Sequence, residues 1–315
     1  MSFAGSPDRS EARLVPEAGF EFDPFRISGL PRRPSPALAR AILLAGQATR
    51  ACAAILGARR PDVVLGGGGY VSGPMVYAAW RKRIPAAVLE ADAHLGLANQ
   101  LAVPFVRRVF LAYPLPGREG RKYRVVGRPL RRLPEVSRAE ARVRFGLPAE
   151  GPALLVFGGS QGAAALNQVA FAAFAAAGPP VLHLCGERYL GTLAAPARPD
   201  YRLLPWTDDL PAALAATDLV LARSGGSVWE IAAAGKPAIL VPSPNVTADH
   251  QAKNARYFES AAVVVSEAEI ERVPELVRSL LADPARLAEM GAGMRRLAKP
   301  DAAATIAEEL VALAS

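Results

Sequence analysis

Short apolar runs rich in β-branched and aliphatic residues alternate with helix-length segments along most of the chain. The helix-length segments include Leu38–Leu56 and Glu267–Leu281. The predicted strands are Asp62–Leu65, Ala86–Glu90, Arg108–Ala112, Ala153–Phe157, Val181–Cys185, Asp218–Ala222 and Pro237–Val241. This alternation predicts parallel sheets with helices on both faces, which is a doubly wound α/β fold.

A Pro-, Arg- and Gly-rich stretch over residues 113–151 interrupts the alternation, and we place a domain boundary within it. A chain of 315 residues is long enough for two domains with separate cores. We predict an N-terminal domain over residues 1–134 and a C-terminal domain over residues 135–300. Residues 301–315 form one more predicted helix, which we expect to pack back on the N-terminal domain. Its apolar face carries Ile306, Leu310, Val311 and Leu313.

Charge is distributed unevenly along the chain. Residues 1–134 hold 21 Lys/Arg against 9 Asp/Glu, whereas residues 135–315 hold 16 against 20. Seven arginines and no acid lie between Arg26 and Arg60, and Leu101–Arg108 ("LAVPFVRR") mixes apolar with basic residues. This favours an anionic membrane surface as a partner of the first domain, with a solvated helix face as the alternative. No zinc finger, RNP motif or basic heptad supports a nucleic acid partner.

Other sequence signals point to a cytoplasmic location. The sequence shows neither a signal peptide nor an apolar run of transmembrane length. Cys52 and Cys185 lie in apolar segments without metal-ligand or disulfide spacing. We therefore expect both cysteines to be buried, reduced thiols.

Three glycine-rich loops, each directly after a predicted strand, are candidate ligand loops: Gly66–Pro74, Gly158–Gly162 and Ala222–Glu230. Ligands of open α/β sheets bind outside the carboxyl ends of the strands. The second loop stands in "LVFGGSQGAAALN", a pattern typical of a phosphate cradle at a helix N-terminus. It lacks the lysine of a P-loop and the third glycine of the dinucleotide fingerprint. Together the loops predict a ligand-binding cleft between two nucleotide-type domains.

Two acidic positions have both a functional and a structural interpretation. Glu230 lies just inside a helix whose first turn we expect to be Gly226–Trp229. Its carboxylate could accept hydrogen bonds from the vicinal hydroxyls of a ribose, or it could simply favour the helix dipole. The pair Asp208–Asp209 precedes a helical segment, so we interpret it as a helix cap and predict no metal ligands.

Five motifs resemble, in order and spacing, those of the MurG enzymes, the peptidoglycan N-acetylglucosaminyltransferases of glycosyltransferase family 28. They are "GGGGYVSGP", "EADAHLGLAN", "VVGRPLRR", "VFGGSQGAAALNQ" and "LARSGGSVWEIAAAGKPAILVPSPNVTADHQAKNA". The resemblance implies the GT-B fold of two Rossmann-like domains and no cofactor. It implies inverting transfer of GlcNAc from UDP-GlcNAc to the C4 hydroxyl of the muramic acid of lipid I. The product would be lipid II, formed at the cytoplasmic face of the membrane.

The resemblance also implies roles for particular residues of the second domain. Ser160 would contact the diphosphate, Glu230 the ribose and Gln251 the sugar. Arg131 would lie beside the donor, and Trp206–Thr207 would contact the uracil. The full set of expected donor-binding residues is Arg131, Ser160, Gln161, Gly162, Trp206, Thr207, Ser224, Gly225, Gly226, Ser227, Glu230 and Gln251.

The first domain would hold the lipid-linked acceptor. Glu90 and Asp92 are the predicted catalytic residues. Glu90 matches the family pattern, whereas Ala91 and Asp92 replace its Gln and Asn. Asp92 could act as a base toward the acceptor hydroxyl, or it could be a loop cap. His94 is a second possible base. The other expected acceptor-side residues are Gly68, Gly69, Tyr70, Ser72 and Asn99.

Family members begin with a strand, a Gly-rich loop and a helix before the counterpart of this chain's first residues. We therefore expect roughly 30 residues, one strand–helix unit, to be absent here. Three alternatives stay open on function. The chain could use another lipid acceptor, or bind nucleotide sugars without catalysis. It could also be a dinucleotide-dependent oxidoreductase in which Glu187 holds the ribose.

Overall fold

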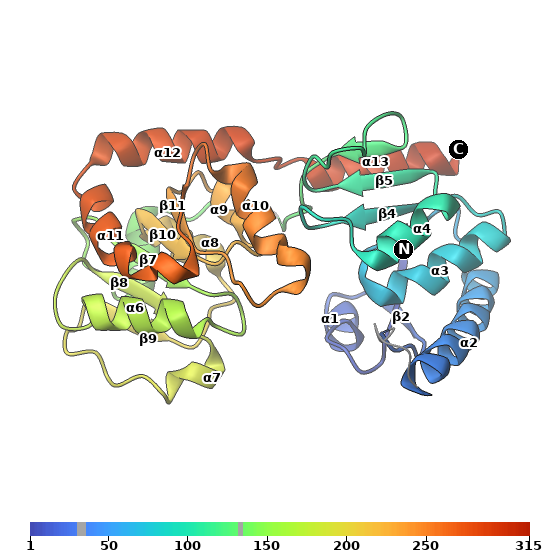
Figure 1. Ribbon diagram of the computed structural model, residues 1–315, viewed down its shortest axis with the longest axis horizontal. Coiled ribbons are helices and arrows are strands. Elements are labelled where there is room, and N and C mark those ends of the chain that lie inside the picture. Colours follow the sequence, from blue (N-terminus) through green and yellow to red (C-terminus); the bar gives the residue numbers. More distant parts are fainter. Residues whose placement is uncertain (30–35, 132–134) are drawn as a thin grey trace. The chain divides into compact units, whose positions relative to one another are not determined.

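The computed structural model describes residues 1–29, 36–131 and 135–315, without the side chains of residues 36–42 and 247. Arg32 and Arg33 of the predicted basic segment lie outside the described residues, as does the side chain of Arg40. The described chain forms two compact units (Figure 1). Unit 1 comprises Met1–Val126 and Ala303–Ser315, and unit 2 comprises Gly127–Ala302.

Unit 1 contains two parallel sheets. Strands β1 (Ser2–Gly5) and β2 (Glu21–Pro24) pair with each other. The second sheet has the order β3-β4-β5-β6. Its strands are β3 (Val64–Gly66), β4 (Ala86–Glu90), β5 (Arg108–Leu111) and β6 (Tyr123–Val125). The helices between the strands are α1 (Glu11–Glu17), α2 (Pro36–Arg59), α3 (Gly69–Arg81), α4 (Leu97–Ala102) and the 3-10 turn η1 (Val103–Phe105).

The four-stranded sheet of unit 1 buries apolar residues on both faces. On one face Val88 and Val109 join a core with Cys52 of α2 and Val76 of α3. Residues one position along, Ala87 and Phe110, face the opposite way, as expected for alternating side chains of a strand. Buried, unpaired Cys52 confirms the prediction for that thiol.

Helix α13 (Ala302–Ala314) covers that second face (Figure 1). Ile306 is buried against Ala87 and Phe110, with Leu310 and Leu313 packed beside it. Glu309 forms ion pairs with Arg108 of β5 and Arg124 of β6, each at 2.8 Å. One residue of the predicted apolar face is placed differently, because the Val311 side chain is 67% exposed.

Unit 2 is built on one sheet of six parallel strands in the order β12-β11-β10-β7-β8-β9. The strands are β7 (Leu154–Phe157), β8 (Val181–Leu184), β9 (Tyr201–Leu204), β10 (Leu219–Ala222), β11 (Ala238–Leu240) and β12 (Val263–Val264). The helices are α5 (Arg138–Phe145), α6 (Ala164–Phe174), α7 (Glu187–Leu190), α8 (Leu210–Ala216), α9 (Val228–Ala233), α10 (His250–Phe258), α11 (Val273–Leu281) and α12 (Pro284–Leu297). Two 3-10 turns, η2 (Thr247–Asp249) and η3 (Glu267–Arg272), complete the unit.

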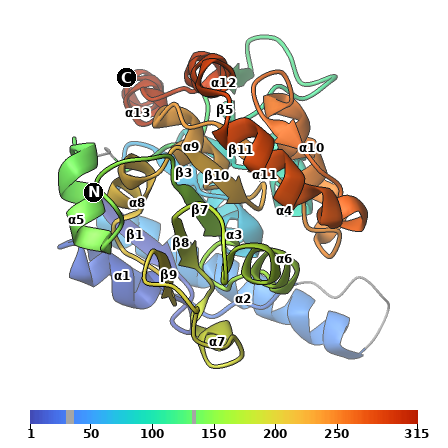
Figure 2. The ribbon, with the colours of Figure 1, turned by 90° about the vertical axis from the view of Figure 1, so that its left-hand side faces the viewer.

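Helices cover both faces of this sheet (Figure 2). Leu154 and Val156 of β7 pack with Leu166 of α6 and Val277 of α11 on one face. Helices α8 and α9 lie on the other side. The predicted helix Glu267–Leu281 is wrong as a single element, since a 3-10 turn ends at Arg272 before α11 begins. Pro274 explains the break because its nitrogen has no hydrogen to donate within a continuous helix.

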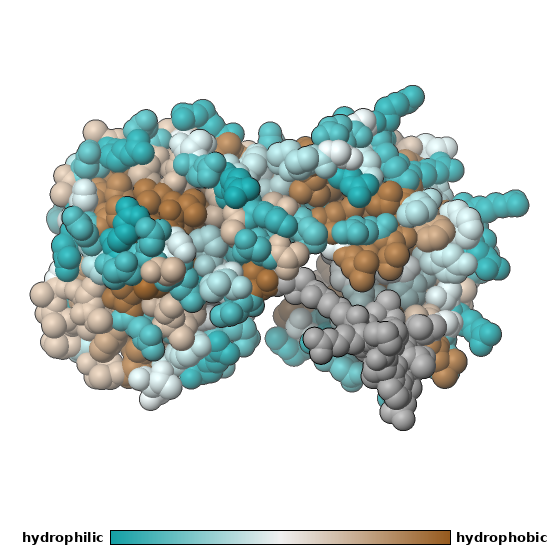
Figure 3. All heavy atoms as spheres, in the orientation of Figure 1, coloured by the Kyte–Doolittle hydropathy of each residue, from teal (hydrophilic) through white to brown (hydrophobic). Residues whose placement is uncertain are grey.

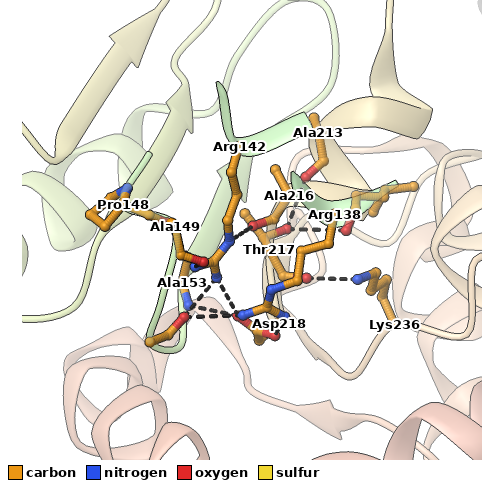
Figure 4. Close-up of polar contacts among 12 residues, drawn as sticks. Arg138, Arg142, Pro148, Ala149, Ala153, Ala213, Ala216, Thr217, Asp218 and Lys236 are labelled. Atoms are coloured by element: carbon orange, nitrogen blue, oxygen red, sulfur yellow. Dashed lines mark hydrogen bonds and ion pairs between the residues drawn. The ribbon is translucent and has the colours of Figure 1, made fainter. Parts of the chain in front are cut away.

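A buried arginine fixes α5 to the sheet (Figure 4). Arg142 is 1% exposed, and its guanidinium donates to the carbonyl oxygens of Ala216 and Gly151 at 3.0 and 2.7 Å. It also pairs with Asp218, which receives a second guanidinium from Arg138. The network satisfies a charge that would be costly to bury alone.

Candidate functional site

The predicted donor-binding residues lie at one edge of the six-stranded sheet. Because all six strands of unit 2 are parallel, the loops that follow β7, β9, β10 and β11 leave the sheet at the same edge. Ser160 follows β7, Trp206 follows β9, Ser224 follows β10 and Gln251 follows β11. This edge is therefore the candidate nucleotide site of unit 2.

The loop between β7 and α6 is held tightly against the end of β8. The Gly162 amide donates to the Gly159 carbonyl at 2.9 Å, and Gly162 has a φ of +69°. A Cβ atom at Gly162 would overlap the carbonyl oxygen of Cys185. Ser160 and Gln161 are exposed at the tip of the loop. No side chain in the described part of unit 2 caps the N-terminus of α6, so its first amides have no side-chain acceptor there.

The buried side chains of Asn167, His183 and Tyr201 form a hydrogen-bonded chain next to that loop. Asn167 of α6 donates from Nδ2 to the Cys185 carbonyl at 2.8 Å. Its Oδ1 lies 3.0 Å from His183 Nε2, and His183 Nδ1 lies 2.7 Å from the hydroxyl of Tyr201. Since Asn167 Oδ1 can only accept, His183 carries its proton on Nε2 and accepts from Tyr201 at Nδ1. Burial lowers the pKa of His183 to about 4, so the ring is neutral at physiological pH.

The loop after β10 is tied to α10. The Ser224 hydroxyl donates to the Gln251 carbonyl at 2.8 Å, and Asn254 donates to the Ser224 carbonyl at 3.1 Å. The side-chain Oε1 of Gln251 accepts from the Ser243 amide at 2.9 Å. A Cβ atom at Gly225 would lie 4.0 Å from Gln251 Nε2. This amide nitrogen, which donates to none of the described residues, therefore lies near Gly225.

Glu230 stands in the first turn of α9, which begins at Val228 and not at Gly226 as predicted. The side chain is half-buried and forms no hydrogen bond or ion pair with any residue that the structure describes. Burial raises the pKa of Glu230 above its usual value, and the positive charge of Arg128 partly opposes that rise. Glu230 therefore presents an acceptor that has no partner in the described protein.

The segment after β9 carries the predicted uracil contacts. The Trp206 side chain is 52% exposed, and Thr207 Oγ1 accepts from the Asp209 amide at 3.1 Å. Asp209 in turn accepts from the Ala212 amide at 3.0 Å, which confirms its predicted role as the cap of α8. Arg131 is exposed, and among the described residues it contacts none of the other predicted donor-binding side chains through a hydrogen bond or ion pair.

The predicted acceptor-side residues of unit 1 meet at the carboxyl ends of β3 and β4. Glu90 is 7% exposed and accepts from the Gly96 amide at 2.8 Å and from Asn99 Nδ2 at 2.9 Å. It also accepts from the Asp92 amide at 3.2 Å. Gly68 lies beside them, since a Cβ atom there would lie 3.7 Å from Asn99 Nδ2. Glu90 thus organises the loop that carries Asp92.

Tyr70 and Ser72 serve local contacts within unit 1. The Tyr70 hydroxyl accepts from Arg9 at 3.2 Å, and the Ser72 hydroxyl donates to the Gly69 carbonyl at 3.0 Å. Asp92 and His94 are half-buried in the loop after β4. Among the described residues, no three His, Cys, Asp or Glu side chains are grouped so that they could hold a metal ion.

Comparison with known proteins identifies the family. Residues 2–111 match the glycosyltransferase family 28 N-terminal domain, and residues 153–306 match its C-terminal domain. A protein of Salinibacter ruber is 39% identical over 99% of this chain and 88% of its own length. A protein of Mycobacterium bovis is 40% identical over 99% of this chain and 81% of its own length. Both are named UDP-N-acetylglucosamine–N-acetylmuramyl-(pentapeptide) pyrophosphoryl-undecaprenol N-acetylglucosamine transferase.

The chain belongs to the MurG family of glycosyltransferases. The crystal structure of Acinetobacter baumannii MurG superposes with a TM-score of 0.77 at 26% sequence identity, covering 98% of this chain and 90% of that one. The predicted GT-B class with two Rossmann-like units is therefore confirmed, as is the prediction of a glycosyltransferase. Membership of the MurG family gives no support to the oxidoreductase alternative built on Glu187.

Sequence reasoning missed two features of this MurG-family site. One is the buried support of His183 and Tyr201 beneath the glycine loop. Asn167 stands in the quoted glycine motif, but nothing in the sequence spacing links it to the other two. The other is Arg128, whose guanidinium lies against Gly226. No periodicity connects positions so far apart in the sequence.

Proposed function

We propose that this chain transfers GlcNAc from UDP-GlcNAc to the C4 hydroxyl of the muramic acid of lipid I, with inversion, and so forms lipid II. The single observation that carries this proposal is the 39–40% identity, over 99% of the chain, to transferases named for that reaction. The placement of the candidate donor residues at one sheet edge supports the same activity.

For the donor, we propose that the β7–α6 loop holds the diphosphate. The uncapped amides at the start of α6 and the exposed Ser160 hydroxyl can donate hydrogen bonds to phosphate oxygens. Glu230 accepts from the ribose hydroxyls, which would supply the partners that its carboxylate lacks. Trp206–Thr207 contacts the uracil, and the free amide of Gln251 contacts the sugar, with Ser224–Ser227 lining the loop between them.

The chemical step places negative charge on the leaving UDP. The bond from the anomeric carbon to the β-phosphate oxygen breaks, and its electron pair stays on that oxygen. The acceptor hydroxyl oxygen bonds to the opposite face of the ring and loses its proton. Preorganised donors aimed at the diphosphate stabilise this charge in the transition state, and removal of one typically costs about a hundredfold or more in rate.

For the acceptor, we propose that Asp92 takes the proton of the attacking hydroxyl. Glu90 is less suited to that task because it already accepts three hydrogen bonds from its own loop. The loop anchored by Glu90 and Asn99 would keep the Asp92 side chain in place. Replacement of Asp92 by Asn should lower kcat while leaving the affinity for UDP unchanged, and an unchanged kcat would remove Asp92 from this role.

We also propose that unit 1 binds the cytoplasmic face of the membrane as a peripheral protein. Trp80, Leu97 and Leu101 are 47%, 60% and 58% exposed, and the Trp80 ring packs 5.0 Å from Phe105. These four residues are called the apolar patch below. Figure 3 shows apolar side chains around α4 on this face, with hydrophilic ones beside them. None of the described helices is long and apolar enough to cross a membrane.

Basic residues adjoin the apolar patch. Arg81, Lys82, Arg83 and Arg107 are exposed next to it in the sequence. Each cation near an anionic leaflet contributes on the order of 1 kcal/mol. One arginine of the predicted basic segment is unsuitable, because Arg59 forms ion pairs with Glu21 and Asp23 of its own unit. The membrane surface therefore centres on α3, α4 and η1 in this proposal.

The experiment that tests the proposed function is release of UDP from UDP-GlcNAc, with and without a soluble lipid I analogue. We expect release that requires the acceptor and a disaccharide product with inverted configuration. Binding of UDP-GlcNAc without acceptor-dependent release would contradict the transferase activity. Release with a different lipid-linked acceptor alone would contradict the substrate.

A further inference from the structure

Arg128 occupies an unusual position beside the loop after β10. A Cβ atom at Gly226 would overlap the Arg128 guanidinium carbon and would lie 2.7 Å from Nη2. Gly226 does not have a positive φ, so its backbone conformation does not require glycine. A side chain at this position would have to displace the Arg128 guanidinium, which lies directly against Gly226.

The Arg128 guanidinium lacks an acceptor in the described protein. It is half-buried, yet within the described ranges it forms no hydrogen bond and no ion pair. Other arginines of unit 2 with little exposure are paired, as Arg223 is with Glu267 and Arg198 with Asp200. A guanidinium carries five N–H donors in a planar fork that matches phosphate oxygens.

An acidic side chain lies near Arg128 without pairing with it. The charge of Arg128 acts on Glu230, but the two groups are not joined by an ion pair. The segment before α5 and the first turn of α9 thus bring together a cation and a carboxylate that have no partner among the described residues. A ligand that has both an anionic part and hydroxyl groups would satisfy them together, and a nucleoside diphosphate is such a ligand.

We propose that Arg128 binds the diphosphate of the sugar nucleotide and stabilises the charge that develops on UDP as it leaves. This inference rests on the proposed function. Glu230 would hold the ribose hydroxyls, and the guanidinium over Gly226 would contact the neighbouring phosphate oxygens. As the bond to the anomeric carbon breaks, the electron pair moves onto the β-phosphate oxygen, and Arg128 faces that group while the acceptor's proton passes to the base.

The first test compares the affinities of UDP and uridine for the full chain and for Arg128→Ala. We expect the variant to lose about tenfold to a hundredfold in UDP affinity, as for a charge-assisted hydrogen bond. Uridine affinity should change by less than about threefold, since uridine carries no phosphate. Arg128→Lys should restore part of the loss. Arg286→Ala, which removes an exposed arginine of α12 paired with Glu289, is the control for overall charge.

Equal losses for UDP and uridine, or an unchanged UDP affinity, would overturn the inference while the proposed function stands. A wild-type chain that binds no UDP would instead contradict the proposed function and the inference together. Turnover gives a second measurement. Arg128→Ala should lower kcat at saturating UDP-GlcNAc by about a hundredfold, because the charge it faces is largest in the transition state.

The contact with Gly226 allows a double-mutant test. Gly226→Ala should push the guanidinium away and weaken UDP binding in the wild-type background. The same change should have little further effect in Arg128→Ala, where there is no guanidinium to displace. Equal losses in the two backgrounds would show that Gly226 acts independently of Arg128, and would contradict the proposed arrangement.

Discussion

Glu230 carries a carboxylate whose ionisation is opposed by burial and whose acceptors have no partner among the described residues. Such a group is retained at a cost to stability, and ligand hydroxyls can supply the missing donors. We expect Glu230→Gln to lower UDP affinity by about tenfold or more, as for loss of hydrogen bonds to a charged group. The free energy of unfolding should not fall, because the substitution removes a half-buried charge. Calorimetric titration and urea unfolding measure the two effects.

The direction of the pH dependence follows from the raised pKa of Glu230. Protonation of Glu230 begins at a higher pH than for an ordinary glutamate, and it removes acceptor capacity. As the pH is lowered, the UDP affinity of the wild type should therefore begin to fall at a higher pH than that of Glu230→Gln. Glu187→Gln, at an exposed acid after β8, is the control and should behave as the wild type. Parallel pH profiles for wild type and Glu230→Gln would contradict this role.

His183 gives a second pH effect, on stability. Its pKa is lowered to about 4 in the folded chain from an ordinary value of 6.5. Between those values the unfolded chain binds a proton that the folded chain does not. The contribution of neutral His183 to the free energy of unfolding is therefore fully present above about pH 6.5. It falls toward pH 4 by up to about 1.4 kcal/mol per pH unit. Urea unfolding of unit 2 at pH 5 and 7 should show a smaller difference for His183→Gln, and an equal difference would contradict it.

At the scale of the elements, the contact between the glycine loop and β8 fixes the shape of the proposed phosphate site. Gly162→Ala would place a methyl group on the Cys185 carbonyl at a φ that disfavours alanine. We expect a loss of about 2 kcal/mol or more in stability, together with weakened UDP binding. Gly191→Ala is the control, because no atom lies within 4 Å of a Cβ there and its φ is −80°. Full UDP affinity in Gly162→Ala would argue against a diphosphate on this loop.

The sequence predicts some strands of this fold and misses others. All seven predicted runs overlap strands of the structure, from β3 to β11. Most of these strands are buried and therefore almost continuously apolar, although β3 is an edge strand in which Leu65 is exposed. The strands without such a run, β1, β2, β6, β9 and β12, are all edge strands of their sheets. An edge strand has one exposed side and carries polar residues, as in Tyr201–Leu204 ("YRLL"), so its pattern is weaker.

The candidate site also has parts that the sequence predicts and parts that it does not. Loops that follow buried strands could be predicted, since strand ends and glycines mark them in the sequence. Side chains that meet only through folding could not, and the Arg128–Gly226 contact and the Asn167–His183–Tyr201 support are of this kind. The individual roles of the predicted site residues stay predictions until they are tested by substitution.

At the scale of the whole molecule, the apolar patch should decide membrane binding without affecting the nucleotide site of unit 2. The double change of Trp80 and Leu101 to Ala should lower liposome binding by at least about tenfold, since each side chain contributes more than about 1 kcal/mol on insertion. Val143→Ala removes an equally apolar residue, 82% exposed on α5, and should have no effect. Binding that persists in the double variant, or that salt does not weaken, would contradict the proposal.

Helix α13 makes unit 1 depend on residues that follow unit 2 in the sequence. Ile306 is 4% exposed against β4 and β5, whereas Val311 on the same helix is 67% exposed. Ile306→Ala should destabilise unit 1 by about 2 to 5 kcal/mol, as for other buried large-to-small changes. Val311→Ala is the matched control. Hydrogen exchange in unit 1 should rise in the first variant while UDP affinity stays unchanged, and a rise in unit 2 instead would contradict the assignment of α13.

The return of the chain to unit 1 has a consequence during synthesis. A ribosome makes β4 and β5 before unit 2, whereas the helix that covers their second face is made after unit 2. At about 5 to 20 residues per second, the whole of unit 2 is translated first. Ala87 and Phe110 of the nascent chain therefore lack the packing of α13 for a time on the order of ten seconds. Unit 1, although begun before unit 2, is completed after it.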